Sequence, residues 1–220
     1  MARLTVSSAA ESEILTTAEA KTHLRVTHSA EDTYIDTLIK VATQYAEKYC
    51  AGNFIETTYK MTMESWNDVF VSNATQLSNY NVLKSYSYPS GGYYSPYTGL
   101  PQIFLPKAPL SSVSSIQYYN SDNVQEIFSD DDYNVLNPEN QKGFIELVDG
   151  KDFPNIYSRG SAITITFVSG YGSSASDVPE PIKQAVLLII GSLYEKREDT
   201  VKRMPTTVEY LLEPYRIVEY

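Results

Sequence analysis

The sequence is poor in the residues that most often carry chemistry. Its 220 residues include one cysteine, Cys50, and two histidines, His23 and His28. A single cysteine cannot form an internal disulfide bond, which fits a reducing compartment. The sequence contains no CxxC or HExxH pattern, so it lacks the ligand spacing of the common zinc sites. We therefore expect neither a metal ion nor any other cofactor.

Long hydrophobic runs are also missing. The longest uninterrupted one, Ala185–Ile190 (AVLLII), is far shorter than the roughly 20 residues that a helix needs to cross a bilayer. Near the N-terminus, Glu11 and Glu13 stand where a signal peptide would have its apolar segment. The sequence thus predicts no membrane span, and a protein that is made and kept in the cytoplasm.

Basic residues are outnumbered, with 17 Lys and Arg against 27 Asp and Glu and a formal net charge of −10. Duplex DNA is bound mainly through Lys and Arg contacts to phosphate, so this balance argues against a direct grip on DNA. Two interpretations of the acidic surface stay open. It can serve solubility alone, or it can lie beside DNA without binding it.

Candidate catalytic groups do not form a recognisable pattern. The acidic run at 129–132 lacks the spaced oxygens and the glycine of a calcium loop, and the glycines at 91–92 and 170–172 are too sparse to cradle a phosphate. Cys50 falls near the C-terminal end of a predicted helix, where the helix dipole opposes thiolate formation, so we expect it to be buried and structural. The sequence predicts no enzyme activity.

The first quarter of the chain has the signals of two helices. Thr16 and Glu19 have the spacing of a capping box and predict a helix over 17–24. A second helix should follow Ser29–Asp32, because apolar residues then recur at intervals of three and four. These residues are Ile35, Leu38, Ile39, Ala42, Tyr45, Ala46 and Tyr49. We expect Gly52 to end this helix in the left-handed conformation.

From about residue 56 the period changes to two, as in a half-buried strand. Tyr59, Met61 and Met63 alternate with polar residues, and similar runs occur at 102–105, 113–119, 133–136, 143–148 and 162–168. Such short alternating runs predict a small antiparallel β module.

Helical signals return at the end of the chain. Asp177 and Glu180 predict the start of a helix with a broad apolar stripe, which should be the central one. Gly191 lies inside it and suggests close approach of another backbone. A short last helix carries Val208, and the tail Tyr215–Tyr220 could extend as a strand or an arm.

These elements predict an α+β fold in which N- and C-terminal segments form a small α-helical bundle and an antiparallel β module is inserted between them. The expected domains are 1–55 with 175–220 for the helical bundle, and 56–174 for the β-rich insertion.

A Tyr-rich segment at 78–101 interrupts the β module without any period. Tyr, Ser and Gly are typical of adaptable contact surfaces, which makes this loop a candidate partner-contacting site. The candidate residues are Tyr86, Tyr88, Tyr93, Tyr94 and Tyr97. The alternative is an excursion that packs on its own module.

Both ends of the sequence resemble one known family. At the N-terminus the resemblance lies in 15–26 (LTTAEAKTHLRV), 31–39 and 45–49, and at the C-terminus in 171–172, 178–185, 194–198 and 208–216. In order and separation these blocks are similar to the head-tail connector (adaptor) proteins of long-tailed double-stranded DNA phages and related prophages. The Tyr-rich segment matches no motif of that family.

The resemblance implies a structural, non-enzymatic subunit of the virion neck, assembled in the host cytoplasm and acting in DNA packaging and ejection. Such subunits form a ring, usually a dodecamer, between the portal protein and a head-closure (stopper) or tail-completion protein. DNA would pass through the channel without specific binding.

Family members commonly grip the portal with their C-terminal end. The resemblance therefore implies candidate portal-binding residues in the tail, namely Tyr215, Arg216, Ile217, Val218, Glu219 and Tyr220. The alternative is a tail that packs on its own helices. For the whole protein, the competing hypothesis is a β-rich recognition module that binds a carbohydrate or a host surface through the Tyr-rich loop.

Overall fold

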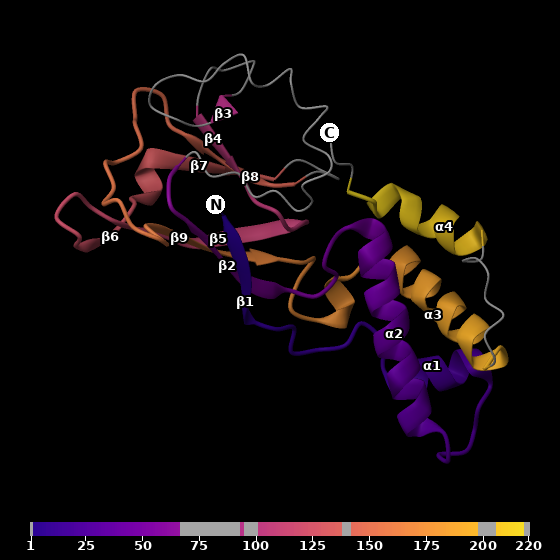
Figure 1. Ribbon diagram of the computed structural model, residues 1–220. Coiled ribbons are helices and arrows are strands. Elements are labelled where there is room, and N and C mark those ends of the chain that lie inside the picture. The colour runs from indigo at the N-terminus through magenta and orange to yellow at the C-terminus, as the bar shows by residue number, and fades with distance from the viewer. Residues whose placement is uncertain (1, 67–92, 95–100, 138–141, 198–205, 218–220) are drawn as a thin grey trace. The chain divides into compact units, whose positions relative to one another are not determined.

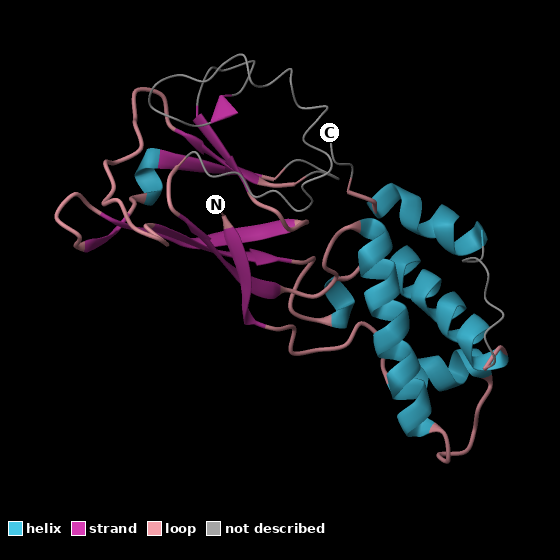
Figure 2. Ribbon diagram, in the orientation of Figure 1, coloured by secondary structure: helices cyan, strands magenta, loops and turns pink. Residues whose placement is uncertain are grey.

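The computed structural model describes residues 2–66, 93–94, 101–137, 142–197 and 206–217 (Figure 1). It has the mixed α+β composition predicted from the sequence, with antiparallel sheets (Figure 2). The chain divides into two compact units. We call Met1–Ala9 with Thr57–Ser169 the β unit, and Ala10–Glu56 with Gly170–Tyr220 the helical unit.

The helical unit begins with α1 (Thr17–Leu24) and its predicted capping box is confirmed. The Glu19 amide donates to the Thr16 hydroxyl at 3.2 Å, and the Thr16 amide donates to the Glu19 carboxylate at 2.7 Å. These two bonds satisfy amide groups that the first turn of a helix leaves without partners.

The end of α2 (Asp32–Cys50) differs from expectation. Ala51, and not Gly52, adopts the left-handed conformation, with φ of 55°. The Ala51 amide donates to the Lys48 carbonyl and the Gly52 amide to the Glu47 carbonyl, at 3.4 and 3.1 Å. Because α2 stays helical through Cys50, the first residue past its end is alanine, and these two bonds hold it there.

The start of α3 (Glu180–Glu195) also differs. Asp177 does not cap it; its carboxylate accepts from the Ser174 amide at 3.0 Å and closes the 3₁₀ turn η3 (Ala175–Asp177). Among the described residues, no backbone from outside α3 lies next to Gly191, contrary to the expectation. A Cβ atom there would lie 3.4 Å from the His23 Nε2, so a side chain approaches it.

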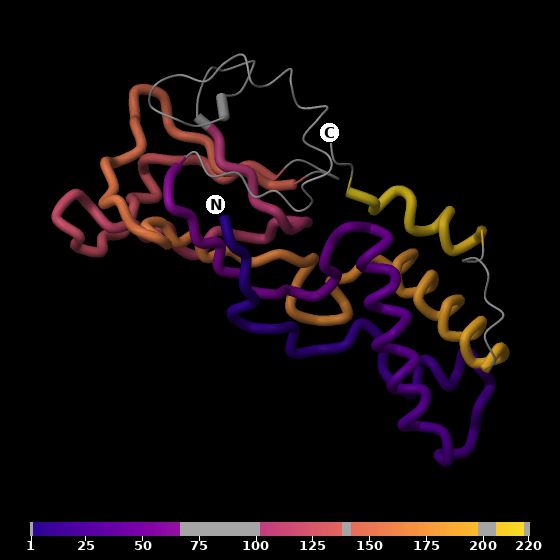
Figure 3. The backbone as a smooth tube through the Cα atoms, viewed as in Figure 1, coloured from indigo at the N-terminus to yellow at the C-terminus, as the bar shows by residue number. Residues whose placement is uncertain are grey.

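One core joins helices from both ends of the chain. α3 packs against α2 and against α4 (Thr206–Leu212), and α1 contacts both α2 and α3. The chain trace in Figure 3 shows α3 running between α2 and α4. The buried residues of these helices are Ala20, Ile35, Leu38, Ile39, Ala42, Ala46, Cys50, Ile182, Ala185, Val186, Ile189, Ile190, Val208 and Leu212.

The β unit contains two antiparallel sheets. The five-stranded sheet has the order β1-β2-β9-β5-β6, formed by β1 (Arg3–Ser8), β2 (Thr57–Met63), β5 (Leu110–Tyr119), β6 (Gln125–Ile127) and β9 (Ile163–Ser169). The four-stranded sheet has the order β3-β4-β8-β7, formed by β3 (Tyr93–Tyr94), β4 (Pro101–Phe104), β7 (Tyr133–Leu136) and β8 (Phe144–Leu147).

Alternation along the central strand β9 builds the core of this unit. Ile163, Ile165 and Phe167 are buried, while the residues between them are partly exposed. Tyr59 on β2 is the cross-strand partner of Phe167, and their rings stack with centroids 5.6 Å apart. Trp66 adds a second aromatic contact, with its ring 4.6 Å from that of Phe153.

Strand β1 lay outside the predicted β module. The expected helical domain included its residues, but β1 pairs with β2, with Leu4 opposite Met61. It is an edge strand with mostly exposed side chains, so it has no buried alternating face to reveal it in the sequence. The second boundary also differs, because residues 170–174 belong to the helical unit.

The predicted Tyr-rich loop falls mostly on residues outside the described part of the chain. Tyr86, Tyr88 and Tyr97 lie outside it. Tyr93 and Tyr94 form β3, where Tyr93 pairs with Gln102 and Tyr94 with Pro101. This segment therefore contains at least one piece of regular structure.

Candidate assembly surfaces

The C-terminal tail is attached to the end of α2. Ile217 is only 6% exposed, and its amide donates to the Cys50 carbonyl at 2.8 Å. That carbonyl lies at the C-terminus of α2, where backbone acceptors have no partner within the helix. The tail thus supplies a donor that the helix end lacks. We call Glu213, Tyr215, Arg216 and Ile217 the C-terminal anchor.

Aromatic rings surround this anchor. The Tyr49 hydroxyl donates to the Glu213 carboxylate at 2.9 Å, and the Arg216 guanidinium lies 5.7 Å from the centre of the Tyr49 ring. Tyr215 meets Tyr171 edge-on, with centroids 6.5 Å apart. Burial raises the pKa of Tyr171 to about 12, so this phenol stays neutral at physiological pH.

These contacts locate the candidate portal-binding residues. Tyr215 and Ile217 pack against the helical unit, while Arg216 is exposed. Val218, Glu219 and Tyr220 lie outside the described residues. Through Ile217, therefore, the tail packs on its own helices, and the portal-binding role stays a prediction.

Cys50 is buried, as predicted, and its surroundings do not favour the reactive thiolate form. Burial, with smaller contributions from Glu213 and Glu47, raises the pKa of its thiol to about 12. Its Sγ lies 4.0 Å from the Leu212 carbonyl oxygen. A thiol with this pKa remains protonated at neutral pH, so Cys50 contributes packing between α2 and α4.

A second polar cluster joins the start of α2 to the end of α3. Arg197 Nη2 lies 2.5 Å from the Glu31 carboxylate, which also accepts from the Tyr194 hydroxyl. The guanidinium lies 5.0 Å from the centres of both the Tyr34 and the Tyr194 rings. The bond from Tyr194, and then that from Arg197, holds the pKa of Glu31 below its ordinary value.

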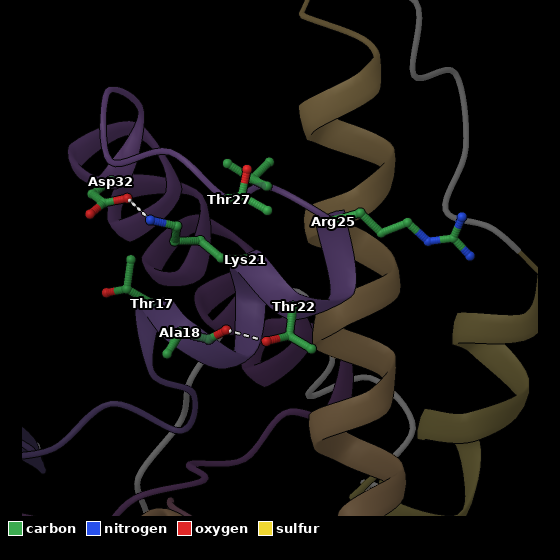
Figure 4. A pocket seen from close by; sticks show the side chains of 8 residues that line it. Thr17, Ala18, Lys21, Thr22, Arg25, Thr27 and Asp32 are labelled. Carbon is green, nitrogen blue, oxygen red and sulfur yellow. Dashed lines mark hydrogen bonds and ion pairs between the residues drawn. The ribbon is translucent and has the colours of Figure 1, made fainter.

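An open pocket between α1 and the start of α2 offers little to a charged ligand (Figure 4). Its Lys21 Nζ lies 2.6 Å from Asp32 Oδ1, so these charges neutralise one another. The Thr22 hydroxyl donates to the Ala18 carbonyl at 2.8 Å. The Arg25 side chain points away from this ion pair in Figure 4.

Sequence reasoning missed both polar clusters because each joins residues far apart in the chain. Tyr49 and Glu213 are 164 positions apart, and Glu31 and Arg197 are 166 apart. The apolar periodicity placed Tyr49 on the buried face of a helix, and no local pattern indicated the carboxylate that its hydroxyl contacts.

Two further properties concern only the part of the chain that the structure describes. Within it, no three His, Cys, Asp or Glu side chains gather in a way that could hold a metal ion. Within it, too, no helix combines the length and the apolar character that a bilayer crossing needs.

Residues 15–87, which include α1, α2 and β2, match the family model of the phage gp6-like head-tail connector protein. The predicted resemblance to head-tail connectors is confirmed. No curated protein matches this chain.

Solved structures share the fold of this chain almost from end to end. A chain from the neck of an empty gene transfer agent (GTA) particle, computed with C6 symmetry, has a TM-score of 0.70 and 22% identity, over 99% of this chain and 97% of that one. A chain from the virion of a native GTA particle gives 0.70 and 22%, over 99% and 96%. One from the native GTA neck, computed with C12 symmetry, gives 0.66 and 22%, over 99% and 97%. These likenesses establish the fold.

Proposed function

We propose that this protein is a structural head-tail connector (adaptor) subunit of a phage-type virion neck. It forms a ring between the portal protein and a head-closure (stopper) or tail-completion protein. The observation that carries this proposal is a fold shared over 99% of the chain with a protein of a particle neck, together with the connector family match. Its work is mechanical, and we expect no catalytic activity.

The ring is a dodecamer in this proposal. Support comes from a similar chain in a neck computed with C12 symmetry. A closed ring of identical subunits uses a head-to-tail interface, so each subunit must present two different complementary surfaces.

DNA passes through the channel of the ring without specific binding. Each subunit has a formal charge of −10, so twelve copies carry about twelve times that, −120. Acidic side chains on the channel wall would repel phosphate and keep the DNA free to slide. A ring reconstruction with a neutral or basic channel, and the acids confined to the outside, would contradict this.

The extreme C-terminus binds the portal. The anchor holds the tail through Ile217, which leaves Val218, Glu219 and Tyr220 as the segment to test. A chain ending at Ile217 should keep the melting temperature of the intact protein but fail to join portal-containing heads. A chain ending at Pro214 should also lose stability, because it lacks Tyr215, Arg216 and Ile217 of the anchor. Unimpaired attachment of the first truncation would disprove this role.

Electron microscopy of the purified protein mixed with portal-containing heads tests the proposal as a whole. We expect rings, or density stacked on the portal vertex. A protein that stays monomeric, never attaches to the portal and binds glycans on an array would instead support the recognition-module hypothesis.

A further inference from the structure

Two helices of the helical unit carry large apolar side chains on their outer surfaces. On α2, Val41 and Tyr45 are 47% and 49% exposed, and on α4, Tyr210 is 85% exposed. The core-facing residues of the same helices, such as Ala42 and Val208, are fully buried. Exposed tyrosines next to apolar neighbours are the residue type that most often anchors protein interfaces.

The exposed surface of α2 carries one acid, Asp36, near its start and two lysines further along. Val41 and Tyr45 lie one turn apart, and Lys40 and Lys48 flank them. Both lysines are exposed, and neither makes an ion pair with a residue that the structure describes. We call Lys40, Val41, Tyr45 and Lys48 the basic patch. In a chain with a net charge of −10, it is a local site of attraction for acidic groups.

The exposed tyrosine of α4 has acidic neighbours, of which Glu209 is half-buried. Glu209 precedes Tyr210, and Glu213 follows one turn later; the last turn of α4 has no basic residue. Glu213 is engaged by Tyr49 and Arg216, whereas Glu209 forms no ion pair with any described residue. We call Glu209 and Tyr210 the acidic patch.

The two patches occupy different helices of one unit. α2 and α4 each pack against α3, which runs between them (Figure 1). Two acidic patches would repel each other, and so would two basic patches, whereas an acidic and a basic patch attract. This charge pattern disfavours contact of either patch with its own copy, and of the arrangements that pair unlike patches, only the repeating head-to-tail one builds a ring.

We propose that the acidic patch of one subunit docks on the basic patch of a second copy of this chain. Tyr210 packs over Val41 and Tyr45, and Glu209 pairs with Lys40 or Lys48. Repetition of this contact joins the subunits of the ring. The inference rests on the proposed connector function, which requires such a contact without specifying its residues.

Cysteine cross-linking tests the direction of the contact. Gln44→Cys and Thr207→Cys chains, whose exposed sites lie beside the two patches and leave Tyr45 and Tyr210 in place, are mixed at about 1 mM, where a contact with a dissociation constant of that order is substantially occupied, and treated with a short bis-maleimide. Cys50 is buried and its thiol is protonated, so the introduced cysteines react first. We expect cross-linked dimers only in the mixture, and a ladder of multimers from the double variant. Cross-linking of Thr207→Cys alone, no cross-linking in the mixture, or dimers without larger multimers from the double variant would overturn the proposal.

Charge reversal tests the chemistry of the contact. Charge reversals are added to the two cysteine variants. The double reversal Lys40→Glu with Lys48→Glu should lower the yield of cross-linked dimer at least tenfold, and so should Glu209→Lys alone. Combining the reversed basic patch on one chain with the reversed acidic patch on the other should restore it. Lys60→Glu, the same change on β2 of the β unit, serves as the matched control and should have no effect. Equal losses in the control, or no rescue, would contradict the pairing.

Electron microscopy of the intact chain separates failure of this inference from failure of the proposed function. Rings without α2–α4 cross-links would reject the contact and leave the connector function in place. Specific cross-links in a protein that never forms rings and never joins portal-containing heads would keep the contact and reject the connector function.

Discussion

The helical unit and the β unit both bury aliphatic side chains, but the helical core adds alanines and the β core adds aromatic rings. Helices α1, α2 and α3 bring alanines together, with Ala20, Ala42, Ala46 and Ala185 all fully buried. The β unit instead buries the large rings of Tyr59, Trp66, Phe128 and Phe167, with the partly buried Phe153 packed against this cluster. Small residues let helices approach closely, whereas each ring contributes a large buried volume to the β core. The helical core should therefore be most sensitive to added volume, and the β core to removed volume.

The largest effect should come from truncating a ring in the β unit. Phe167→Ala removes a fully buried ring that stacks on Tyr59. It should lower the free energy of unfolding by about 3–5 kcal/mol. Urea denaturation followed by far-ultraviolet circular dichroism measures it. Phe104→Ala, at a ring that is 44% exposed, is the matched control and should cost much less. Similar losses for both would refute this account of the β core.

Adding volume should be most harmful in the helical unit. Ala46→Leu adds three carbon atoms at a fully buried position of α2. It should lower the free energy of unfolding by about 1–3 kcal/mol. Easier opening of the unit should also speed the reaction of the Cys50 thiol with a disulfide reagent. Gln44→Leu, on the exposed side of the same helix, should leave stability and thiol reactivity nearly unchanged. A neutral Ala46→Leu would mean that the helices are not closely packed there.

A smaller effect is expected at the first helix. Thr16→Ala removes the hydroxyl that accepts from the Glu19 amide, and should cost about 1 kcal/mol. Thermal unfolding compares it with Thr33→Ala, whose hydroxyl in α2 caps nothing in the described structure. Unlike the substitutions in the two cores, loss of this cap lowers helix stability without changing the volume of either core.

The smallest effect concerns pH. The pKa of Glu31 is lowered in the folded protein, so its interactions with Tyr194 and Arg197 stabilise the fold above the unfolded pKa. This stabilisation should disappear as the pH falls from about 4.5, the ordinary value for Glu, through the folded pKa. Glu31→Gln should flatten the acidic limb of a stability-versus-pH curve, and Tyr194→Phe, which removes the first cause of the lowered pKa, should flatten it in part. An unchanged curve would show that the interactions of Glu31 with Tyr194 and Arg197 do not contribute to the stability of the fold.

Local patterns predicted most of both units. The Thr16–Glu19 capping box marked the start of α1, and alternation of Ile163, Ile165 and Phe167 marked β9, because each signal depends on neighbours within a few residues. Strand β1 went unpredicted because an exposed edge strand needs no apolar alternation. The end of α2 was predicted one residue late. Two backbone hydrogen bonds at the helix end, from the amides of Ala51 and Gly52, let Ala51 adopt the left-handed conformation that was expected of Gly52.

The candidate surfaces show the same division. The sequence identified the C-terminal tail as a candidate contact segment, but it did not show that Ile217 is bound to the end of α2. Nor did it distinguish Tyr45, which is half exposed, from its buried neighbours on the apolar face. The exposure of a side chain on a helix depends on which segments pack against that helix. The segments that pack against α2 include α3 and α4, which come from the far end of the chain.

By itself, the sequence determined the type and approximate extent of most elements, the acidic balance of the chain and its resemblance to head-tail connectors. Only the tertiary structure decided that residues 3–8 join the β unit, that Glu31 meets Arg197, and that the tail is anchored through Ile217. The physical reason is range. Helix caps and apolar periods arise from residues a few positions apart, whereas edge pairing and ion pairs across about 160 residues exist only once the chain has folded.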